Sequence, residues 1–428
     1  MTPQVKERIE QIRRGEVPKG YKKTKVGVVP NEWEETRFKK MFSRLSRKNK
    51  ENNDNVLTIS AQYGLISQRD FFNKDIASED KSNYFLLHNG EFAYNKSYSN
   101  GYPFGALKRL DMYDKGIVSP LYICFSANES NECPDFYVHY FEAGMMNREI
   151  QAFAQEGARN HGLLNISVDD FFNSYLLMPP LAEQQKIARI LSAQDKLIAL
   201  KEKLLEEKKR QKKALMQQLL TGKKRLPGFS GAWKKQKMAD ILRERKEENK
   251  EQSLRICSVA VNSGVVDQRE HLGKSMAASD TSNYNVVHYG DIVYTKSPTG
   301  AFPFGIVKQS QLAENVAVSP LYGVYEPATY EIGYLLNEYF MYSNNANGYL
   351  LPIVNKGAKN TINISNATFI TPSLYLPTDF EEIKKLVQIF KAANKEIDLL
   401  QKDLDQEKQK KKALMQLLLT GIVRTTNV

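Results

Sequence analysis

The sequence predicts an α+β protein built from two similar globules and two long antiparallel, coiled-coil-like helices, related by a pseudo-two-fold repeat. Three observations lead to this fold class. The two halves of the chain match each other, the matched parts mix short strand-like runs with turn residues, and each half closes with a long apolar stripe at helical spacing. With 428 residues, the chain is also longer than one ordinary domain.

The internal repeat aligns at an offset of 200 residues, which becomes 199 near the end of each half. Trp33 matches Trp233, and these are the two tryptophans of the chain. The longest matched segments are YNKSYSNGYPFGALK (94–108) with YTKSPTGAFPFGIVK (294–308), VSPLY (118–122) with VSPLY (318–322), and KKALMQQLLTG (212–222) with KKALMQLLLTG (411–421). Such dense matching indicates two copies of one unit and not a solenoid of short repeats.

The globules are expected at residues 21–179 and 222–378, after a short helical segment at 1–20. Short β-like runs, such as residues 56–60 and 291–294, are bounded by Gly, Pro, Asn and Ser, which is typical of strands joined by turns. Helical patches near residues 136–153 and 332–342 interrupt the strands. Each globule is therefore predicted to be α+β.

The long helices are expected at residues 180–221 and 379–421. Apolar residues recur there at heptad-like spacing without an internal Pro or Gly, Gly222 and Gly421 follow as C-terminal caps, and Thr378 with Glu381 can form a capping box. Roughly 39 residues at about 1.5 Å each span about 58 Å, more than one small globule covers. We therefore expect the helices to pack antiparallel on each other; two independent surface helices are the alternative.

Composition and charge limit the possible function classes. The formal net charge is +12, from 61 basic and 49 acidic residues, which favours a polyanionic partner. The sequence contains neither a stretch of 18 apolar residues nor a hydrophobic N-terminal segment, so no membrane span or secretory signal is expected. Three unevenly spaced cysteines fit neither a disulfide framework nor a zinc site, which favours a reducing cytoplasm.

Motifs of catalysis and cofactor binding are missing from the sequence. It contains no GxG pair and no GxxxxGK[ST] segment, so neither a dinucleotide site nor a P-loop is indicated. Asp240 with Glu248 and Lys250 resembles a metal-nuclease core only faintly, and the first copy lacks matching acids. We therefore expect no catalytic residue, no metal site and no cofactor bound by this chain.

Four segments resemble those of a known family. They are VPNEWEE (29–35), GARNHGLLNISVDDFF (157–172), PPLAEQQKIARIL (179–191) and KKALMQQLLTGKKRL (212–226). Together with the order globule, helix, globule, helix, they make the chain similar to the specificity subunit of type I restriction–modification systems.

This resemblance implies a non-catalytic DNA-binding chain. Each globule would be a target-recognition domain reading one half of a bipartite site in double-stranded DNA. The helices would set the spacing and dock two adenine-N6 methyltransferase subunits, which restriction/translocase subunits join, and S-adenosylmethionine, ATP and Mg²⁺ would bind those partners. A stand-alone DNA-binding regulator or scaffold and a metal-dependent nuclease are the alternatives.

Three groups of residues are candidates for contacting DNA: the basic stretches at 43–50 and 243–250, the Tyr-x-Lys-Ser loops beginning at 94 and 294, and the Gly-Ala-(Arg/Lys)-Asn segments at 157–160 and 357–360. Arg and Asn can read base edges bidentately, whereas Lys and Ser suit phosphate. The candidates are Arg44, Arg47, Lys48, Arg69, Lys96, Ser97, Tyr98, Lys108, Arg159, Asn160, His161, Arg243, Arg245, Lys246, Arg269, Lys296, Ser297, Thr299, Lys308, Lys359 and Asn360.

The repeat offers a rule for sorting these candidates. Two globules that read different half-sites need different base-reading residues, so shared residues favour phosphate contact or the fold. The shared pairs are Lys96/Lys296, Ser97/Ser297, Arg69/Arg269, Lys108/Lys308 and Asn160/Asn360. Divergent positions, namely 98–102 against 298–302 and His161 against Thr361, favour base readout. A solvated surface charge is the alternative for any single basic residue, and Phe104 and Phe304 are expected in a turn and core.

Overall fold

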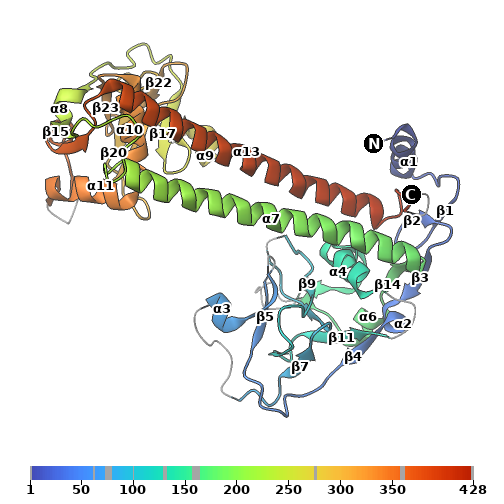
Figure 1. Ribbon diagram of the computed structural model, residues 1–428. Helices are drawn as coiled ribbons and strands as arrows, with labels where there is room; N and C mark the ends of the chain where they lie inside the picture. The colour runs from blue at the N-terminus through green and yellow to red at the C-terminus, as the bar shows by residue number, and fades with distance from the viewer. Residues whose placement is uncertain are drawn as a thin grey trace. The chain divides into compact units, whose positions relative to one another are not determined.

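The computed structural model describes residues 2–60, 63–72, 80–99, 101–128, 133–156, 164–273, 277–356 and 362–425. Its contacts divide the chain into two compact units. Unit 1 comprises Met1–Glu202 with Asp403–Val428, and unit 2 comprises Lys203–Lys402. The long helices are α7 (Leu181–Leu219) and α13 (Phe380–Leu418) (Figure 1). The boundary between the units falls within each helix, so one part of each helix belongs to unit 1 and the other part to unit 2.

Unit 1 places its strands and short helices before α7. They are α1 (Pro3–Arg13), β1 (Tyr21–Lys23), β2 (Val28–Pro30), β3 (Glu34–Arg37), α2 (Phe38–Met41), β4 (Phe42–Leu45), β5 (Leu57–Ser60), β6 (Gly64–Ser67), α3 (Gln68–Phe72), β7 (Phe85–His88), β8 (Phe92–Asn95), β9 (Ala106–Arg109), β10 (Lys115–Val118), β11 (Ile123–Ala127), α4 (Pro134–Glu142), α5 (Asn147–Phe153), β12 (Gln155–Glu156), β13 (Leu164–Asn165), α6 (Val168–Asn173) and β14 (Tyr175–Met178).

Unit 2 repeats this order from β3 onward between α7 and α13, with an added 3₁₀ turn. Its elements are β15 (Lys234–Lys237), α8 (Met238–Ile241), β16 (Leu242–Glu244), β17 (Ile256–Ala260), β18 (Gly264–Asp267), α9 (Gln268–Leu272), β19 (Asn285–Val287), β20 (Ile292–Thr295), β21 (Ile306–Gln309), β22 (Val316–Val318), β23 (Gly323–Pro327), α10 (Tyr330–Phe340), α11 (Ser343–Leu350), the 3₁₀ turn η1 (Leu351–Ile353), β24 (Asn355–Lys356), β25 (Ile362–Asn363), α12 (Asn366–Phe369) and β26 (Ser373–Leu376).

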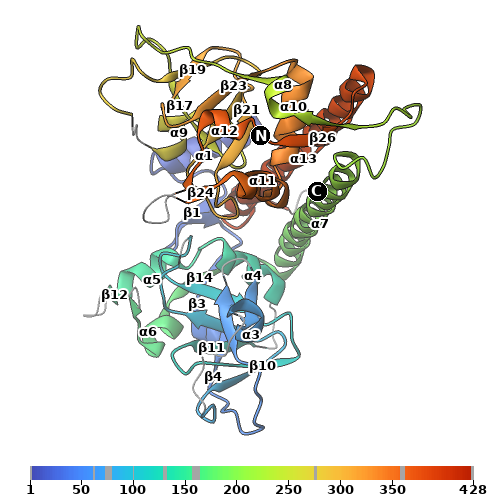
Figure 2. The same cartoon turned by 90° about the vertical axis from the view of Figure 1, so that its left-hand side faces the viewer.

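The central sheet of each unit has the same topology. In unit 1 the antiparallel order is β4-β11-β8-β9, and in unit 2 it is β16-β23-β20-β21. Even the register repeats, because Tyr94 pairs with Leu107 and Tyr294 pairs with Val307. Figure 2 labels β21 and β23 of the unit 2 sheet. The predicted duplication of an α+β globule is therefore confirmed.

A helix packs on one face of each central sheet because the alternate strand residues there are apolar. In unit 1, Phe92 and Phe125 lie in one core cluster with Phe136 and Tyr140 of α4. In unit 2, Ile292 and Tyr325 cluster with residues of α10. Within the described ranges, no helix is long and apolar enough to cross a membrane.

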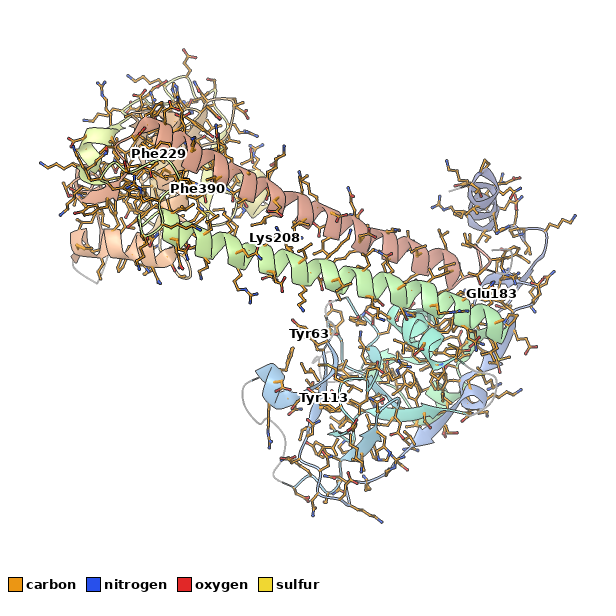
Figure 3. All side chains as sticks on the ribbon, in the orientation of Figure 1. Tyr63, Tyr113, Glu183, Lys208, Phe229 and Phe390 are labelled. Atoms are coloured by element: carbon orange, nitrogen blue, oxygen red, sulfur yellow. The ribbon has the colours of Figure 1, made fainter. Side chains whose placement is uncertain are left out.

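The two long helices pair antiparallel in both units, as predicted. Ile187 and Leu191, near the start of α7, share the core of unit 1 with Leu418 near the end of α13. The reverse holds in unit 2, where Leu219 at the end of α7 clusters with Phe390 near the start of α13, labelled in Figure 3.

The helix ends follow the sequence signals with one correction. Gly222 and Gly421 adopt left-handed φ angles of 66° and 69°, so both predicted C-terminal caps are present. The capping box assigned to Thr378 is wrong. The Asp379 side chain accepts the Glu381 N–H at 2.9 Å instead, because α13 begins at Phe380, one residue later than that box requires.

Candidate nucleic-acid interface

The basic stretches at 43–50 and 243–250 each commit one arginine to the fold. Arg47 forms a two-pronged pair with Glu91, at 3.0 and 3.1 Å, and Arg245 pairs with Asp291 at 2.7 and 3.1 Å. Each carboxylate also accepts a backbone N–H of the turn that precedes it. Hydrogen bonding to Asp291 is the largest cause of the raised pKa of Arg245. These arginines hold the sheet to a turn, so their geometry favours a structural role.

Other members of these stretches remain accessible. Arg44, Arg243 and Lys246 are exposed side chains. Lys48 is half-buried, because its ammonium donates to the Asn83 carbonyl at 2.8 Å and lies over the Phe85 ring. Arg44, Arg243 and Lys246 are therefore candidates that DNA could reach without breaking a structural contact.

The Tyr-x-Lys-Ser segments begin the loop that joins two strands of each central sheet. Tyr94 and Tyr294 are fully buried, and each hydroxyl donates to a carbonyl ten residues on, that of Phe104 at 2.6 Å or Phe304 at 2.7 Å. Both phenylalanines pack against their core clusters, which confirms the turn and core assignment.

A glycine closes each of these loops for steric reasons. At Gly305 the backbone has φ = 101°, and a Cβ would collide with the Thr295 carbonyl oxygen. Gly105 repeats the arrangement against Asn95. Because both ends of the loop are fixed, the residues between them can differ between the two copies without disturbing the sheet.

The loop brings several candidates together on the surface of unit 2. Ser297 and Thr299 line a concavity of about 370 Å³, together with Asn262, His271 and Tyr322 from neighbouring elements. Burial, opposed by Glu244, lowers the pKa of the half-buried Lys296 beside them. In unit 1, Lys96 and Ser97 are half-buried, and Tyr98 is 61% exposed. In each unit the loop offers hydroxyl and cationic groups, and in unit 1 also an exposed aromatic ring, which suits nucleic acid.

The shared lysines of the next strand turn inward. Lys108 forms an ion pair with Glu142 of α4 and donates to the Tyr102 hydroxyl at 3.0 Å. Lys308 is only 4% exposed, and burial lowers its pKa to about 8. Of the two roles that the repeat leaves open for this pair, the fold is favoured over phosphate contact.

The remaining candidates fall into two groups, one within the described residues and one outside them. Arg69 pairs with Asp54 at 3.1 Å on the surface of unit 1, and Arg269 is exposed in unit 2. The candidates Arg159, Asn160, His161, Lys359 and Asn360, with Thr361, lie outside the described residues. Among the described residues, no group of three His, Cys, Asp or Glu side chains could hold a metal ion.

Sequence reasoning missed one exposed pair of residues. Leu121 and Leu321 are 61% and 72% exposed, although each lies in the repeated VSPLY turn. The Ser119 and Ser319 hydroxyls each accept the leucine N–H at 3.3 Å and hold the turn. A shared residue that neither packs in the core nor can bind phosphate is a candidate for contacting a partner common to both units. Its signal in the sequence was an apolar residue kept in both copies of a turn.

Comparison with known proteins shows what these features resemble. Residues 30–210 match the family model described as the type I restriction modification DNA specificity domain. A curated relative from Methanocaldococcus jannaschii, named as the MjaX type I restriction enzyme specificity subunit, is 24% identical over 209 residues, or 47% of this chain and 48% of that relative. The match thus spans about half the length of the curated relative.

Solved structures support the fold over nearly the whole chain. The type I restriction–modification S subunit from M. genitalium is 12% identical, with a TM-score of 0.52 over 90% of this chain and 96% of that chain. A chain from a structure describing assembly and conformational transition of the type I R-M system is 14% identical, with a TM-score of 0.52 over 92% of this chain and 99% of that chain. The resemblance to type I specificity subunits is therefore confirmed.

Proposed function

We propose that this chain is the non-catalytic DNA-specificity subunit of a type I restriction–modification complex, with each globule reading one half of a bipartite site. One observation carries the proposal. The two units share a sheet register and a loop anchored at both ends, yet the residues between the anchors differ. Such an arrangement keeps a scaffold constant while it changes what is read. The family match and the basic excess support DNA as the molecule that is read.

The antiparallel helices would connect the two readers and supply the surface for two adenine-N6 methyltransferase subunits. Restriction/translocase subunits would join that core. S-adenosylmethionine would bind to the methyltransferase subunits, and ATP and Mg²⁺ would bind to the restriction subunits. The chain itself would bind DNA, orient both readers and hold the assembly together.

Methylome sequencing of cells with and without this chain tests the proposal. We expect adenine-N6 methylation at a bipartite motif that disappears when the chain is deleted. A Pro298→Tyr/Thr299→Ser variant carries the residues of unit 1 at two divergent loop positions of unit 2, so only one half of the motif should change. The matched control is Tyr375→Phe, which alters an exposed residue of β26. An unchanged methylome after deletion would leave the stand-alone regulator as the better explanation.

A further inference from the structure

A polar cluster lies where the globule of unit 1 packs on its part of the helix pair. We call His139 of α4, Asp195 of α7 and Lys411 of α13 the docking cluster of unit 1. His139 Nδ1 lies 3.7 Å from Asp195 Oδ2, and Asp195 Oδ1 lies 2.5 Å from Lys411 Nζ. His139 Nε2 is also 3.0 Å from the Ser192 hydroxyl. His139 is only 5% exposed, whereas the side chains of Lys411 and Asp195 are 20% and 42% exposed.

Unit 2 has a corresponding docking cluster of Glu338 from α10, Asn394 from α13 and Lys212 from α7. The Asn394 amide donates to Glu338 Oε1 at 2.9 Å and to the Tyr334 hydroxyl at 2.8 Å. Lys212 donates to Asn394 Oδ1, and its Nζ lies 3.5 Å from Glu338 Oε2. Glu338 is 1% exposed, so these partners replace water around its carboxylate.

The two clusters correspond residue by residue at the offset of 199. Lys411 corresponds to Lys212, and this lysine is kept. The carboxylate, however, changes sides. In unit 1 it is Asp195 on the long helix, opposite a histidine of the globule. In unit 2 it is Glu338 on the globule, opposite the long-helix amide of Asn394.

The charge of each cluster depends on this exchange. Burial is the largest influence on His139 and lowers its pKa below the ordinary value of 6.5, so the ring is neutral at pH 7 and Asp195 alone balances Lys411. Nearby Lys108 has its own partner, Glu142. In unit 2, Lys308 also acts on Glu338, which raises the pKa of that lysine while Lys212 lowers it. Each cluster thus has one carboxylate for the lysine of the helix pair.

Exchanging the globules would break this balance in both places. The first globule on the helix segments of unit 2 would set His139 against Asn394 and Lys212, with no carboxylate for the lysine. The second globule on the segments of unit 1 would set Glu338 against Asp195, with two carboxylates for Lys411. In unit 2, where Glu338 is 1% exposed, breaking the ion pair is strongly destabilising, since it leaves a buried charge without compensation. In unit 1 the cost is smaller, because the Asp195 side chain is 42% exposed and water screens its pair with Lys411.

We propose that the carboxylate exchange between globule and helix assigns each globule to its own segment of the helix pair. The two readers are therefore not interchangeable, although they share one fold. The consequence for DNA rests on the proposed function. Because each globule keeps its own position on the helix pair, each half-site would always be read at the same position.

A double-mutant cycle in the full chain tests the assignment. His139→Glu and Asp195→Asn each create a mismatch, and the double variant reproduces the arrangement of unit 2. Thermal unfolding of unit 1 is followed by Trp33 fluorescence in a Trp233→Phe background. We expect each single variant to lower Tm by about 3 to 6 °C, because Lys411 and its carboxylate are no longer matched at a partly exposed site. The double variant should recover at least half of the summed loss.

Two controls distinguish docking from general damage. Ser192→Ala removes a neutral hydrogen bond to His139 and should shift Tm by no more than about 3 °C, without rescue by Asp195→Asn. The reciprocal cycle, Glu338→His with Asn394→Asp, is read by Trp233 in a Trp33→Phe background and should show the same coupling. Additive shifts in both cycles would overturn the proposal.

A globule-duplication variant tests the consequence for the whole protein. Residues 222–378 are replaced by a second copy of residues 21–179, with both long helices retained, and Asn394→Asp is added or omitted. We expect the added carboxylate to raise Tm by at least 5 °C and to restore methylation at a motif with two like half-sites. No gain in Tm refutes the assignment. A gain in Tm without directed methylation, in cells whose methyltransferase is active, refutes the proposed function and leaves the assignment standing.

Discussion

Lys108 and Lys308 occupy the same position of the repeat, yet we predict opposite results when each is replaced by methionine. Lys108 is held by Glu142 and the Tyr102 hydroxyl. Lys308 is 4% exposed and lies within the influence of Glu338, which Lys212 already neutralises in part. Lys308→Met should therefore stabilise unit 2, whereas Lys108→Met should destabilise unit 1.

The magnitude follows from the pKa of Lys308. Burial, its largest cause, lowers that pKa from 10.5 to about 8. At about 1.4 kcal/mol per pKa unit, protonated Lys308 costs up to about 3 kcal/mol of folding free energy. Methionine keeps much of the aliphatic packing, so we expect a gain of about 1–3 kcal/mol at pH 7. Lys108→Met leaves a partly buried carboxylate with one hydrogen bond and should cost about 1–2 kcal/mol.

The pH dependence has a definite sign. Because the folded-state pKa of Lys308 lies below the unfolded value, the unfolded chain binds more protons between about pH 8 and 10.5. The contribution of Lys308 to stability therefore rises with pH across this window. Its cost is present in full below pH 8 and is absent above about 10.5. Lys308→Met should remove that rise.

Urea unfolding of the full chain measures both effects. The chain has two tryptophans, one in each unit, so Trp33→Phe leaves Trp233 as the reporter for unit 2 and Trp233→Phe leaves Trp33 for unit 1. Midpoints are compared between pH 7 and pH 10 within each background. A lower midpoint for Lys308→Met than for its parent at pH 7, or an equal difference between them at both pH values, would refute the reasoning.

Three further predictions concern DNA. Lys296→Ala should weaken binding to all sequences about equally and reduce the slope of log affinity against log salt by about one unit, as for one lost phosphate contact; altered base preference with an unchanged slope would assign Lys296 to base readout. Leu321→Ala should weaken DNA binding several-fold without changing that slope. Leu351→Ala, at a comparably exposed leucine, is the control and should leave DNA affinity unchanged. Equal losses of affinity in the two variants would remove Leu321 from the interface. Four residues inserted after Leu200 lengthen α7 by about 6 Å and nearly complete a turn, so methylome sequencing should show a spacer longer by one or two base pairs with the same half-sites. Two inserted residues rotate the stripe by about 200° and should abolish methylation; unaltered spacing in the four-residue variant would show that the helices do not set it.

The sequence by itself determined the duplication, the α+β class and the paired helices. These features depend on local patterns, because an uninterrupted apolar stripe predicts a helix that needs a partner, and glycine after the stripe predicts its end. The long helices predicted at 180–221 and 379–421 are observed at Leu181–Leu219 and Phe380–Leu418, so their starts agree to within one residue and their ends to within three. The buried Tyr94 and Tyr294, with Gly105 and Gly305, explain why the loop motif recurs.

Only the tertiary structure decided which basic side chains remain available to a partner. Arg47, Lys108 and Arg245 look like surface charges in sequence, but their carboxylate partners lie 34 to 46 residues away along the chain. The carboxylate exchange was hidden for the same reason, since Asp195 and His139 become neighbours only when α4 packs on α7. Periodicity encodes which face of an element is buried, whereas the partner of a charge depends on how distant segments pack together.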